Sequence, residues 1–409
     1  MFELTKSIQK FSIEIKLFFL FNFLYFLEFT MAKEYNIIIV FAVLLLFYFV
    51  RNFKYIKYLD KYYFFYFIYL FLLLIKGFYN ANFKSYLFYD LVCFSTFFIC
   101  LIVFRKKCSS VNNSFFLDIY PRAAYIVTII SLLFLLVFIS MHGFTMASME
   151  YGRGLDDLKT KLMSPKYFIG SSLFLYPLKS YIKDKIKRLV FDAAIVGYIF
   201  FSLAMSSRST IIIGIMVMIA TNINLSYKNI NLSLMWNYRF ISFILIVIFT
   251  ILFLYQIPTI ASATDYLILR FNEDESFGQT RTEEANDILD GLALSEFLFG
   301  KGLGGSNTYW IFESLPNGVN SAHYGWMFLI LKGGIFFAVF IYGIIISKII
   351  SFSRNKNLIP YAITLFAFLA LEYSHTNFNS FYNLSFMCIA LAAFTDNVQS
   401  LDGDKRITY

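Results

Sequence analysis

Long apolar runs alternate with short polar segments along almost the whole chain. Each run is near the length of about 20 residues that a helix needs to cross a bilayer. Backbone groups in lipid must satisfy their hydrogen bonds within the segment, and the runs lack the alternation of a membrane β-barrel, so we expect helices. The pattern predicts about twelve spans, at 17–31, 35–50, 62–78, 86–104, 123–141, 166–181, 189–206, 209–225, 240–257, 323–347, 358–373 and 380–396.

The expected fold class is therefore an all-α, polytopic integral membrane protein. Composition agrees, since 59% of the residues are hydrophobic and only 15% are charged, against about a quarter in soluble domains. A net charge of +9 would suggest a nucleic-acid partner in a soluble protein. Here the basic residues concentrate in alternate loops, which is typical of membrane topology, so we expect membrane lipid and no nucleic acid.

The distribution of Lys and Arg also predicts the orientation. With the N-terminus inside, the inner segments carry roughly twice as many basic residues as the outer ones, so both termini should be cytoplasmic. One span more or fewer would reverse half of this topology. The first run, from near Leu17, lacks a small-residue cleavage site and is expected to be retained. None of the four cysteines lies in the large polar stretch, so no disulfide framework is expected.

Three parts of the chain follow from this pattern. Residues 1–257 form an N-terminal bundle of about nine helices, 258–322 a large extracytoplasmic loop, and 323–409 the C-terminal helices with a cytoplasmic tail. A polar loop this long between membrane helices usually carries function, although it could be a solvated connector.

The large loop has a helical pattern of its own. Thr280 and Glu283 fit a T-x-x-E capping box, and apolar residues follow at helical spacing. We therefore expect a short helix that starts near Arg281 and stops at Gly300. The sequence G-K-G-L-G-G at 300–305 lacks the spacing of a phosphate-binding loop and is interpreted as a helix-terminating turn.

Three arginines of the predicted outer half are candidate catalytic residues: Arg208, Arg270 and Arg281. Arginine suits bidentate recognition of phosphate, so three of them could converge on a diphosphate. Arg208 lies in S-S-R-S between two apolar runs, where a charge is costly and often has a partner. It could instead extend to the headgroups, and Arg270 and Arg281 could pair with acids of the loop.

The fourth catalytic candidate is His323, which begins the span 323–347. Histidine exchanges protons near neutral pH, although a lone interfacial histidine is often only an anchor. Lys332 falls inside the same span, and Gly333 and Gly334 would let another helix approach closely.

Weaker candidates for substrate binding share the predicted outer face: Arg153, Glu273, Tyr309, Trp310, His375 and Asn377. The aromatic pair could stack on a sugar or lie at the membrane interface. Four acids near span ends could be ion sites or could pair with bases: Glu28, Asp90, Asp192 and Glu372. No metal-binding motif is present, so we expect neither metal nor cofactor.

The order of these features resembles a known family. S-S-R-S precedes a helix, a large outer loop with arginines follows, and then come EFLFGKGLGG and SAHYGWMFLILKGGIFF. Residues 206–337 are similar in this order to the Wzy-type O-antigen and capsule repeat-unit polymerases and the related O-antigen ligases. The ligases typically have a histidine followed by Asn, Ser or Gln, with a glycine ten residues on. Gly333 keeps that distance from His323, but Tyr324 departs from the pattern, which favours the polymerase.

The resemblance implies a GT-C-like, metal-independent glycosyltransferase of the bacterial inner membrane. Its donor would be a glycan on undecaprenyl diphosphate and its acceptor a newly flipped lipid-linked repeat unit. Arginines would hold the leaving diphosphate, and His323 or a loop carboxylate (Glu273, Asp274 or Glu275) would take the acceptor proton. The resemblance also implies a chain-length regulator as partner.

A transporter or flippase of about twelve spans is the alternative from another class. Such folds have internal repeats, broken helices and mostly short loops. The sequence shows no repeat, and the long outer loop fits that class poorly.

Overall fold

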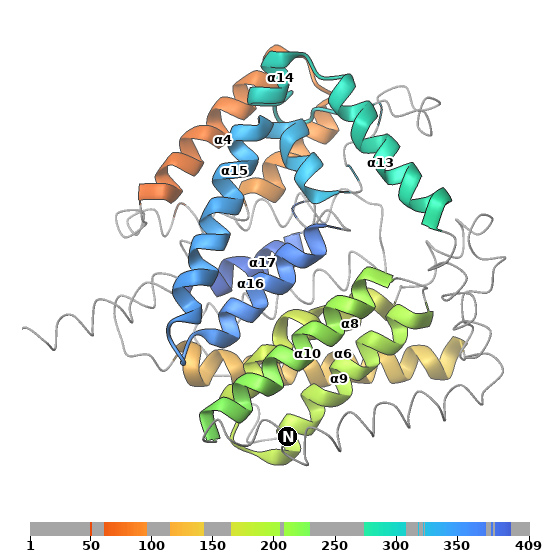
Figure 1. Ribbon diagram of the computed structural model, residues 1–409, viewed down its shortest axis with the longest axis vertical. Coiled ribbons are helices and arrows are strands. Elements are labelled where there is room, and N and C mark those ends of the chain that lie inside the picture. The colour runs from red at the N-terminus through yellow and green to blue at the C-terminus, as the bar shows by residue number, and fades with distance from the viewer. Residues whose placement is uncertain are drawn as a thin grey trace, which may run out of the picture. The chain divides into compact units, whose positions relative to one another are not determined.

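The computed structural model describes residue 50 and residues 61–95, 115–142, 165–204, 208–229, 274–307, 318, 322, 324–373, 378 and 381–393 (Figure 1). Every secondary-structure element named within these ranges is a helix and none is a strand, which confirms the all-α class. The expected spans 17–31, 35–50 (apart from its last residue) and 240–257 lie outside the described residues.

The chain forms two compact units. Unit 1 comprises Met1–Ala123 with Gln279–Tyr409, and unit 2 comprises Ala124–Gly278. The helices of unit 1 are α4 (Lys61–Tyr79), a helix that begins at residue 84 and is described to residue 95, most of α13 (Asp274–Asp290), α14 (Leu294–Phe299), α15 (Gly325–Ser353), α16 (Ile359–Glu372) and α17 (Phe381–Ala392). A π-helical turn, Phe115–Ile119, leads into the helix α6 (Tyr120–His142).

Unit 2 contains most of α6 (Tyr120–His142), α8 (Pro165–Leu175), a 3-10 helix η4 (Tyr176–Tyr181), α9 (Lys185–Ala204) and α10 (Arg208–Asn229). The expected span 166–181 is thus helical throughout, but its last part tightens into η4, where Pro177 stands in the first turn. α9 packs against α8 and α10, and η4 contacts all three helices.

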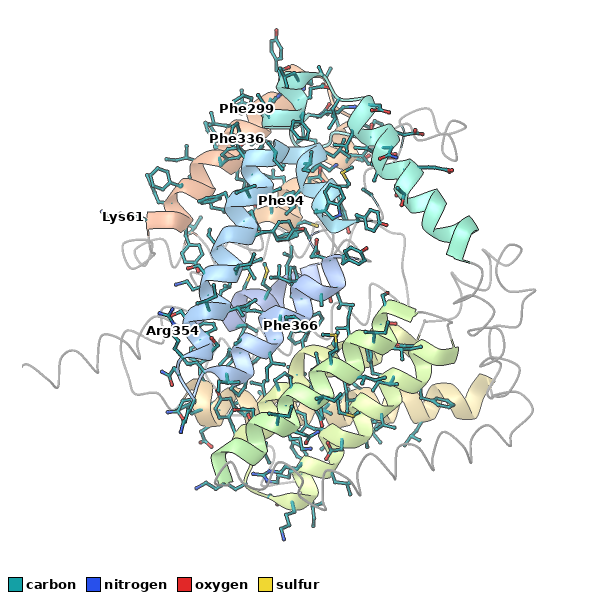
Figure 2. The ribbon with its side chains drawn as sticks, viewed as in Figure 1. Lys61, Phe94, Phe299, Phe336, Arg354 and Phe366 are labelled. Carbon is teal, nitrogen blue, oxygen red and sulfur yellow. The ribbon has the colours of Figure 1, made fainter. Side chains whose placement is uncertain are left out.

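The core of unit 1 is aromatic. The ring of Phe94 stacks on that of Phe328 with centroids 6.0 Å apart, and it meets Phe337 edge-on at 5.7 Å. Phe337 also stacks on Tyr69 of α4 at 5.1 Å. Figure 2 shows Phe94 inside this unit, beside the upper part of α15. Large rings at helical spacing therefore hold α4, the helix 84–95 and α15 together.

Large apolar side chains also lie exposed on the surface of the helices. On α4, Phe64, Phe65, Phe71 and Phe78 are each more than half exposed, whereas Tyr63, Tyr66, Leu70 and Leu73 on the other side are buried. Extended apolar surface of this kind marks contact with lipid or with another protein. Among the described helices, two are long and apolar enough to cross a membrane, Phe116–Leu133 and Gly325–Ser353. The total of about twelve spans stays a prediction.

The helix expected from near Arg281 to Gly300 differs from the structure at its start and in its continuity. α13 begins at Asp274, about two turns before Arg281, so Thr280 lies within the helix and does not cap it. Two acidic residues, Asp274 and Glu275, stand in the first turn, where their negative charges interact favourably with the positive end of the helix dipole. The helical stretch is also interrupted at Gly291–Ala293, so that a separate α14 ends at Gly300.

Candidate functional site

The long helix α15 is broken at Gly334, whose φ of 77° and ψ of 177° are not helical. Such a break takes the preceding carbonyl groups out of the regular helical hydrogen-bond ladder. Here those carbonyls accept bonds from elsewhere: Leu331 O from the Lys301 N–H at 2.8 Å, Lys332 O from the Gly302 N–H at 3.0 Å, and Gly333 O from the Tyr69 hydroxyl at 2.9 Å. The three carbonyl groups before the break are therefore hydrogen-bonded to other parts of unit 1.

The segment Gly300–Gly305, the glycine loop, lies directly against this break. Gly300 has φ +71, and a Cβ built on it would overlap the Lys332 carbonyl. Conversely, a Cβ on Gly334 would overlap the Leu298 carbonyl at the end of α14. Only glycine permits both the backbone angles and this approach of two main chains. The expectation that Gly333–Gly334 admits another helix is confirmed at Gly334, where that helix is α14; a Cβ on Gly333 would meet Phe337 of α15 itself. Gly300 also caps α14 as expected, its N–H donating to Glu296 O at 2.6 Å.

On its other side the glycine loop docks onto the end of α4. The Leu303 N–H donates to Leu73 O at 3.1 Å. The Asn82 amide donates to Leu303 O at 2.8 Å and to Lys301 O at 3.1 Å, and Asn80 also donates to Lys301 O at 2.9 Å. Two asparagines thus satisfy loop carbonyls that have no regular secondary-structure partner.

An ion pair lies behind the glycine loop. Lys332 Nζ is 2.9 Å from Asp90 Oδ2, and both side chains are fully buried. The same carboxylate oxygen accepts the Gly304 N–H at 2.7 Å, and Lys332 Nζ donates to Gly305 O. The ammonium also stands 5.1 Å from the centroid of the Phe328 ring. Both charges are therefore compensated, as buried charges must be.

This pair was only partly foreseen. The sequence placed Lys332 inside a span and Asp90 near the start of another, with pairing as one alternative for the acid; the two residues are in fact paired with each other. The available signal was an opposite charge in each of two otherwise apolar runs.

The chain that follows the loop is anchored at two described points. The Asn307 carbonyl lies against Gly318 so closely that a Cβ there would overlap it. The Tyr86 hydroxyl, from the helix 84–95, donates to Gly318 O at 3.0 Å. Tyr309 and Trp310 belong to the excursion between these points and lie outside the described residues.

A third buried charge meets the start of α15. Glu372, the last residue of α16, accepts the Tyr342 hydroxyl at 3.3 Å and the Phe378 N–H at 3.2 Å. Its carboxylate also lies directly against Gly325, the first residue of α15, where a carboxylate favours the positive helix end. The rings of Tyr324 and Tyr373 are 5.8 Å apart. The expected polar segment after α16 therefore starts beside the beginning of α15.

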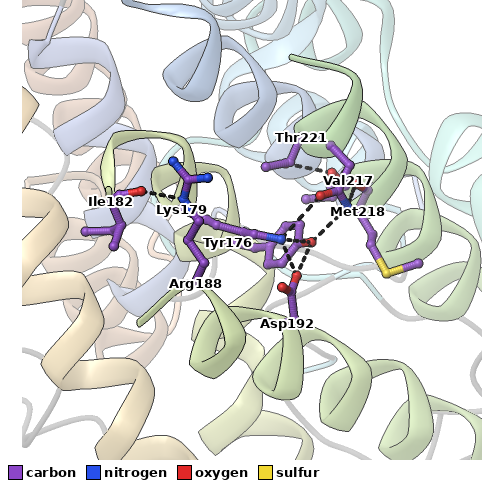
Figure 3. Close-up of polar contacts among 9 residues, drawn as sticks. Tyr176, Lys179, Ile182, Arg188, Asp192, Val217, Met218 and Thr221 are labelled. Atoms are coloured by element: carbon purple, nitrogen blue, oxygen red, sulfur yellow. Dashed lines mark hydrogen bonds and ion pairs between the residues drawn. The ribbon is translucent and has the colours of Figure 1, made fainter. Parts of the chain in front are cut away.

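Unit 2 has a polar cluster of its own (Figure 3). Lys179 of η4 pairs with Asp192 of α9 and donates to the side-chain oxygen Oδ1 of Asn222 at 3.2 Å. The Tyr176 hydroxyl donates to Asp192 at 2.7 Å and accepts from the Asn222 amide at 3.1 Å. Each member satisfies another, so the cluster joins η4 to α9 and α10. Asp192 was expected as an ion site or a paired acid, and it is paired.

Most candidates from the sequence fall outside the described residues: Arg153, Arg270, Glu273, Tyr309, Trp310, His323, His375 and Asn377. The structure positions only the backbone of Arg208, the first residue of α10, and of Arg281, within α13. Convergence of the arginines on a diphosphate therefore stays a prediction.

The described residues include no group of three or more His, Cys, Asp or Glu side chains that could hold a metal ion. Of the cysteines in the described part of the chain, Cys93 and Cys388 are both buried thiols. The strongest chemical feature is thus the broken helix with its buried ion pair and glycine loop.

Comparisons with known proteins leave the chain without a match: no family model, no curated protein and no solved structure is detectably similar to it.

Proposed function

We propose that this protein is a Wzy-type polymerase, a membrane glycosyltransferase that joins undecaprenyl-diphosphate-linked oligosaccharide repeat units at the outer face of the bacterial cytoplasmic membrane. One observation carries the proposal. The two segments on which the resemblance rests, EFLFGKGLGG and the K-G-G of SAHYGWMFLILKGGIFF, pack together through main-chain hydrogen bonds and two glycine contacts. Residues that define the motif in the sequence thus form one structural unit.

The arrangement of unit 1 is compatible with the proposed topology. The turn after α4, the glycine loop and the first part of α15 gather at one end of the unit, and the predicted topology assigns all three to the outer side. Lys61 begins α4 and Arg354 follows α15, each at the far end of its helix (Figure 2). Basic residues at those ends favour the cytoplasmic side.

In the proposed reaction, a hydroxyl of the acceptor repeat unit attacks the anomeric carbon of the donor sugar. The bond to undecaprenyl diphosphate breaks, and the diphosphate leaves with the electron pair. Arg208, Arg270 and Arg281 stabilise the charge that develops on it. His323, or one of the loop carboxylates Glu273, Asp274 and Glu275, takes the proton of the attacking hydroxyl.

The remaining candidates would bind the sugars or the carrier. Aromatic faces stack on sugar rings, and amide, imidazole and guanidinium groups donate hydrogen bonds to hydroxyl and phosphate oxygens. The residues proposed for this role are Arg153, Tyr309, Trp310, His375 and Asn377. The proposal requires neither metal nor nucleotide, and a chain-length regulator is its expected partner.

Two other functions remain as alternatives, a ligase and a transporter. An O-antigen ligase would transfer the finished glycan to lipid A–core, and the His323–Gly333 spacing is compatible with that role. A flippase or other transporter is favoured by one observation, the break in α15, because transporters use broken helices at their binding sites. Here the carbonyls at the break are bonded by Lys301, Gly302 and Tyr69 of the same chain, which argues against a substrate site at that point.

Glycan length in the native host tests the proposal. The gene is deleted and restored as wild type or as Arg208→Ala, Arg281→Ala or His323→Ala, and the glycans are separated on a gel. We expect deletion to leave lipid A–core with a single repeat unit and the wild-type gene to restore the ladder. Loss of all capped core, with polymer accumulating on the carrier, would indicate the ligase instead. An unchanged ladder would refute polymerisation and favour the transporter.

A further inference from the structure

We propose that the Asp90–Lys332 pair is a latch that holds the glycine loop on the broken helix α15 through hydrogen bonds to the loop. By holding it there, the latch fixes the position of Asn307, from which the sequence continues to Tyr309 and Trp310. The inference rests on the proposed function for its consequence in catalysis, but the latch itself is testable without it.

Both charged groups of the pair also bond to the glycine loop. An ion pair that served only to join two helices would need no third element. Here Asp90 Oδ2 accepts the Gly304 N–H at 2.7 Å, and Lys332 Nζ donates to Gly305 O. Each charged group therefore binds the other and also one residue of the loop. Hydrogen bonds to charged groups are stronger than those between neutral groups.

The loop has only one apolar side chain to anchor it. Four of its six residues are glycines, and Leu303 is its only apolar side chain. Leu303 is fully buried, so packing holds the middle of the loop but contributes little at Gly304 and Gly305. Main-chain and asparagine hydrogen bonds fix its other edge, and the buried pair fixes Gly304 and Gly305. Loss of the pair should release this half of the loop.

The glycine loop determines where the chain that follows it begins. Asn307 lies two residues after the loop and meets Gly318, whose carbonyl accepts the Tyr86 hydroxyl. The predicted sugar-binding residues Tyr309 and Trp310 lie in the sequence between these points, and His323 follows two residues before α15 begins. A loop that shifts by a small distance would move the entry of this segment. Positioning errors of about 1 Å can cost roughly a hundredfold in rate.

Replacing one member alone would test the latch poorly, since it leaves a buried charge without its partner and could unfold the bundle. Three double variants avoid this. Asp90→Asn with Lys332→Gln removes both charges but keeps an acceptor and a donor for the loop. Asp90→Ala with Lys332→Met also removes both charges and keeps no hydrogen bond. Asp90→Asn with Lys332→Met is an intermediate that loses only the donor to Gly305.

Trypsin cleavage after Lys301 reports loop release without reference to activity. The Lys301 carbonyl is bonded by Asn80 and Asn82, and the Gly302 N–H donates to Lys332 O, so the docked peptide bond is protected. The full-length protein in detergent is digested, and the fragment beginning at Gly302 is quantified by mass spectrometry. Cleavage after Arg354, which is exposed and follows the far end of α15, is the internal control.

We expect the Ala/Met double variant to elute as a folded protein and to be cleaved after Lys301 roughly tenfold faster than wild type. The Asn/Gln double variant should stay within about twofold of wild type, with the Asn/Met intermediate between them. Should the Ala/Met variant fail to fold, the intermediate carries the same comparison. Unchanged protection in the variants that lose hydrogen bonds, or equal loss in all three, would overturn the latch.

The glycan ladder separates this inference from the proposed function. If the latch positions the substrate-binding segment, the Ala/Met variant loses long chains at wild-type protein level and the Asn/Gln variant keeps them. Faster cleavage of the Ala/Met variant, with an unchanged ladder both in that variant and after deletion of the gene, would leave the latch standing and count against the polymerase. A deletion that shortens the ladder, together with full loop protection in every variant, would keep the polymerase and remove the latch.

Discussion

The backbone of Gly334 provides a quantitative test of how α14, the glycine loop and α15 fit together. Gly334→Ala would force a side chain into φ 77° and ψ 177°, a region open almost only to glycine. The strained backbone costs about 1–3 kcal/mol. The new Cβ would also overlap the Leu298 carbonyl, which is main chain and cannot rotate away.

Relief of that overlap requires α14 to move away from α15. The movement would break the bonds from Lys301 N to Leu331 O and from Gly302 N to Lys332 O, each worth about 1 kcal/mol. We therefore expect Gly334→Ala to lower the free energy of unfolding by about 3–5 kcal/mol. The reduced entropy of the unfolded chain offsets this by less than about 1 kcal/mol.

Gly343→Ala is the matched control, because Gly343 lies in the same helix and a Cβ there meets nothing within 4 Å. Replacing an unstrained helical glycine should raise stability by about 0.5–1 kcal/mol. The free energy of unfolding can be followed by tryptophan fluorescence during SDS titration in mixed micelles. Equal stability of the two variants would refute the close approach of α14 to the break.

Three further changes test other contacts. Lys332→Met alone should lower the free energy of unfolding by about 3–5 kcal/mol, because it leaves Asp90 buried without its cation; adding Asp90→Ala should recover most of the loss, and no recovery would show that the pair is not coupled. Asp192→Ala should destabilise unit 2 by about 1–3 kcal/mol, measured by the same titration, since Lys179 loses its carboxylate; the loss should be larger than for Tyr176→Phe, which keeps the ion pair. Asn82→Ala should speed trypsin cleavage after Lys301 severalfold, because Leu303 O loses its side-chain donor and Lys301 O keeps only Asn80; an unchanged rate would remove Asn82 from the docking of the loop.

Helix positions could be predicted from the sequence wherever an apolar run was bounded by polar residues. The expected spans 62–78, 209–225 and 358–373 correspond closely to α4, Arg208–Asn229 and Ile359–Glu372. The apolar period is long enough in these segments to outweigh local alternatives. Capping patterns were less informative, since T-x-x-E at Thr280 was overridden by a helix that begins at Asp274.

The break in α15 could not be predicted in the same way. Lys332 is the only charged residue between Gly325 and Ile346, and a glycine pair is compatible with a continuous helix. The non-helical angles of Gly334 are stabilised by partners that lie far away in the sequence, at Tyr69 and Lys301–Gly302. The Asp90–Lys332 pair is equally non-local, so periodicity carries no information about it.

Reconstitution tests the central claim most directly. The purified wild-type protein in lipid nanodiscs is given undecaprenyl-diphosphate-linked repeat units from its host, and the products are analysed by mass spectrometry. The account predicts glycans that lengthen by whole repeat units, with one undecaprenyl diphosphate released for each unit joined. The Ala/Met latch variant should form these products more slowly. Substrate that remains as single repeat units, with no carrier released, would contradict the assignment as a polymerase.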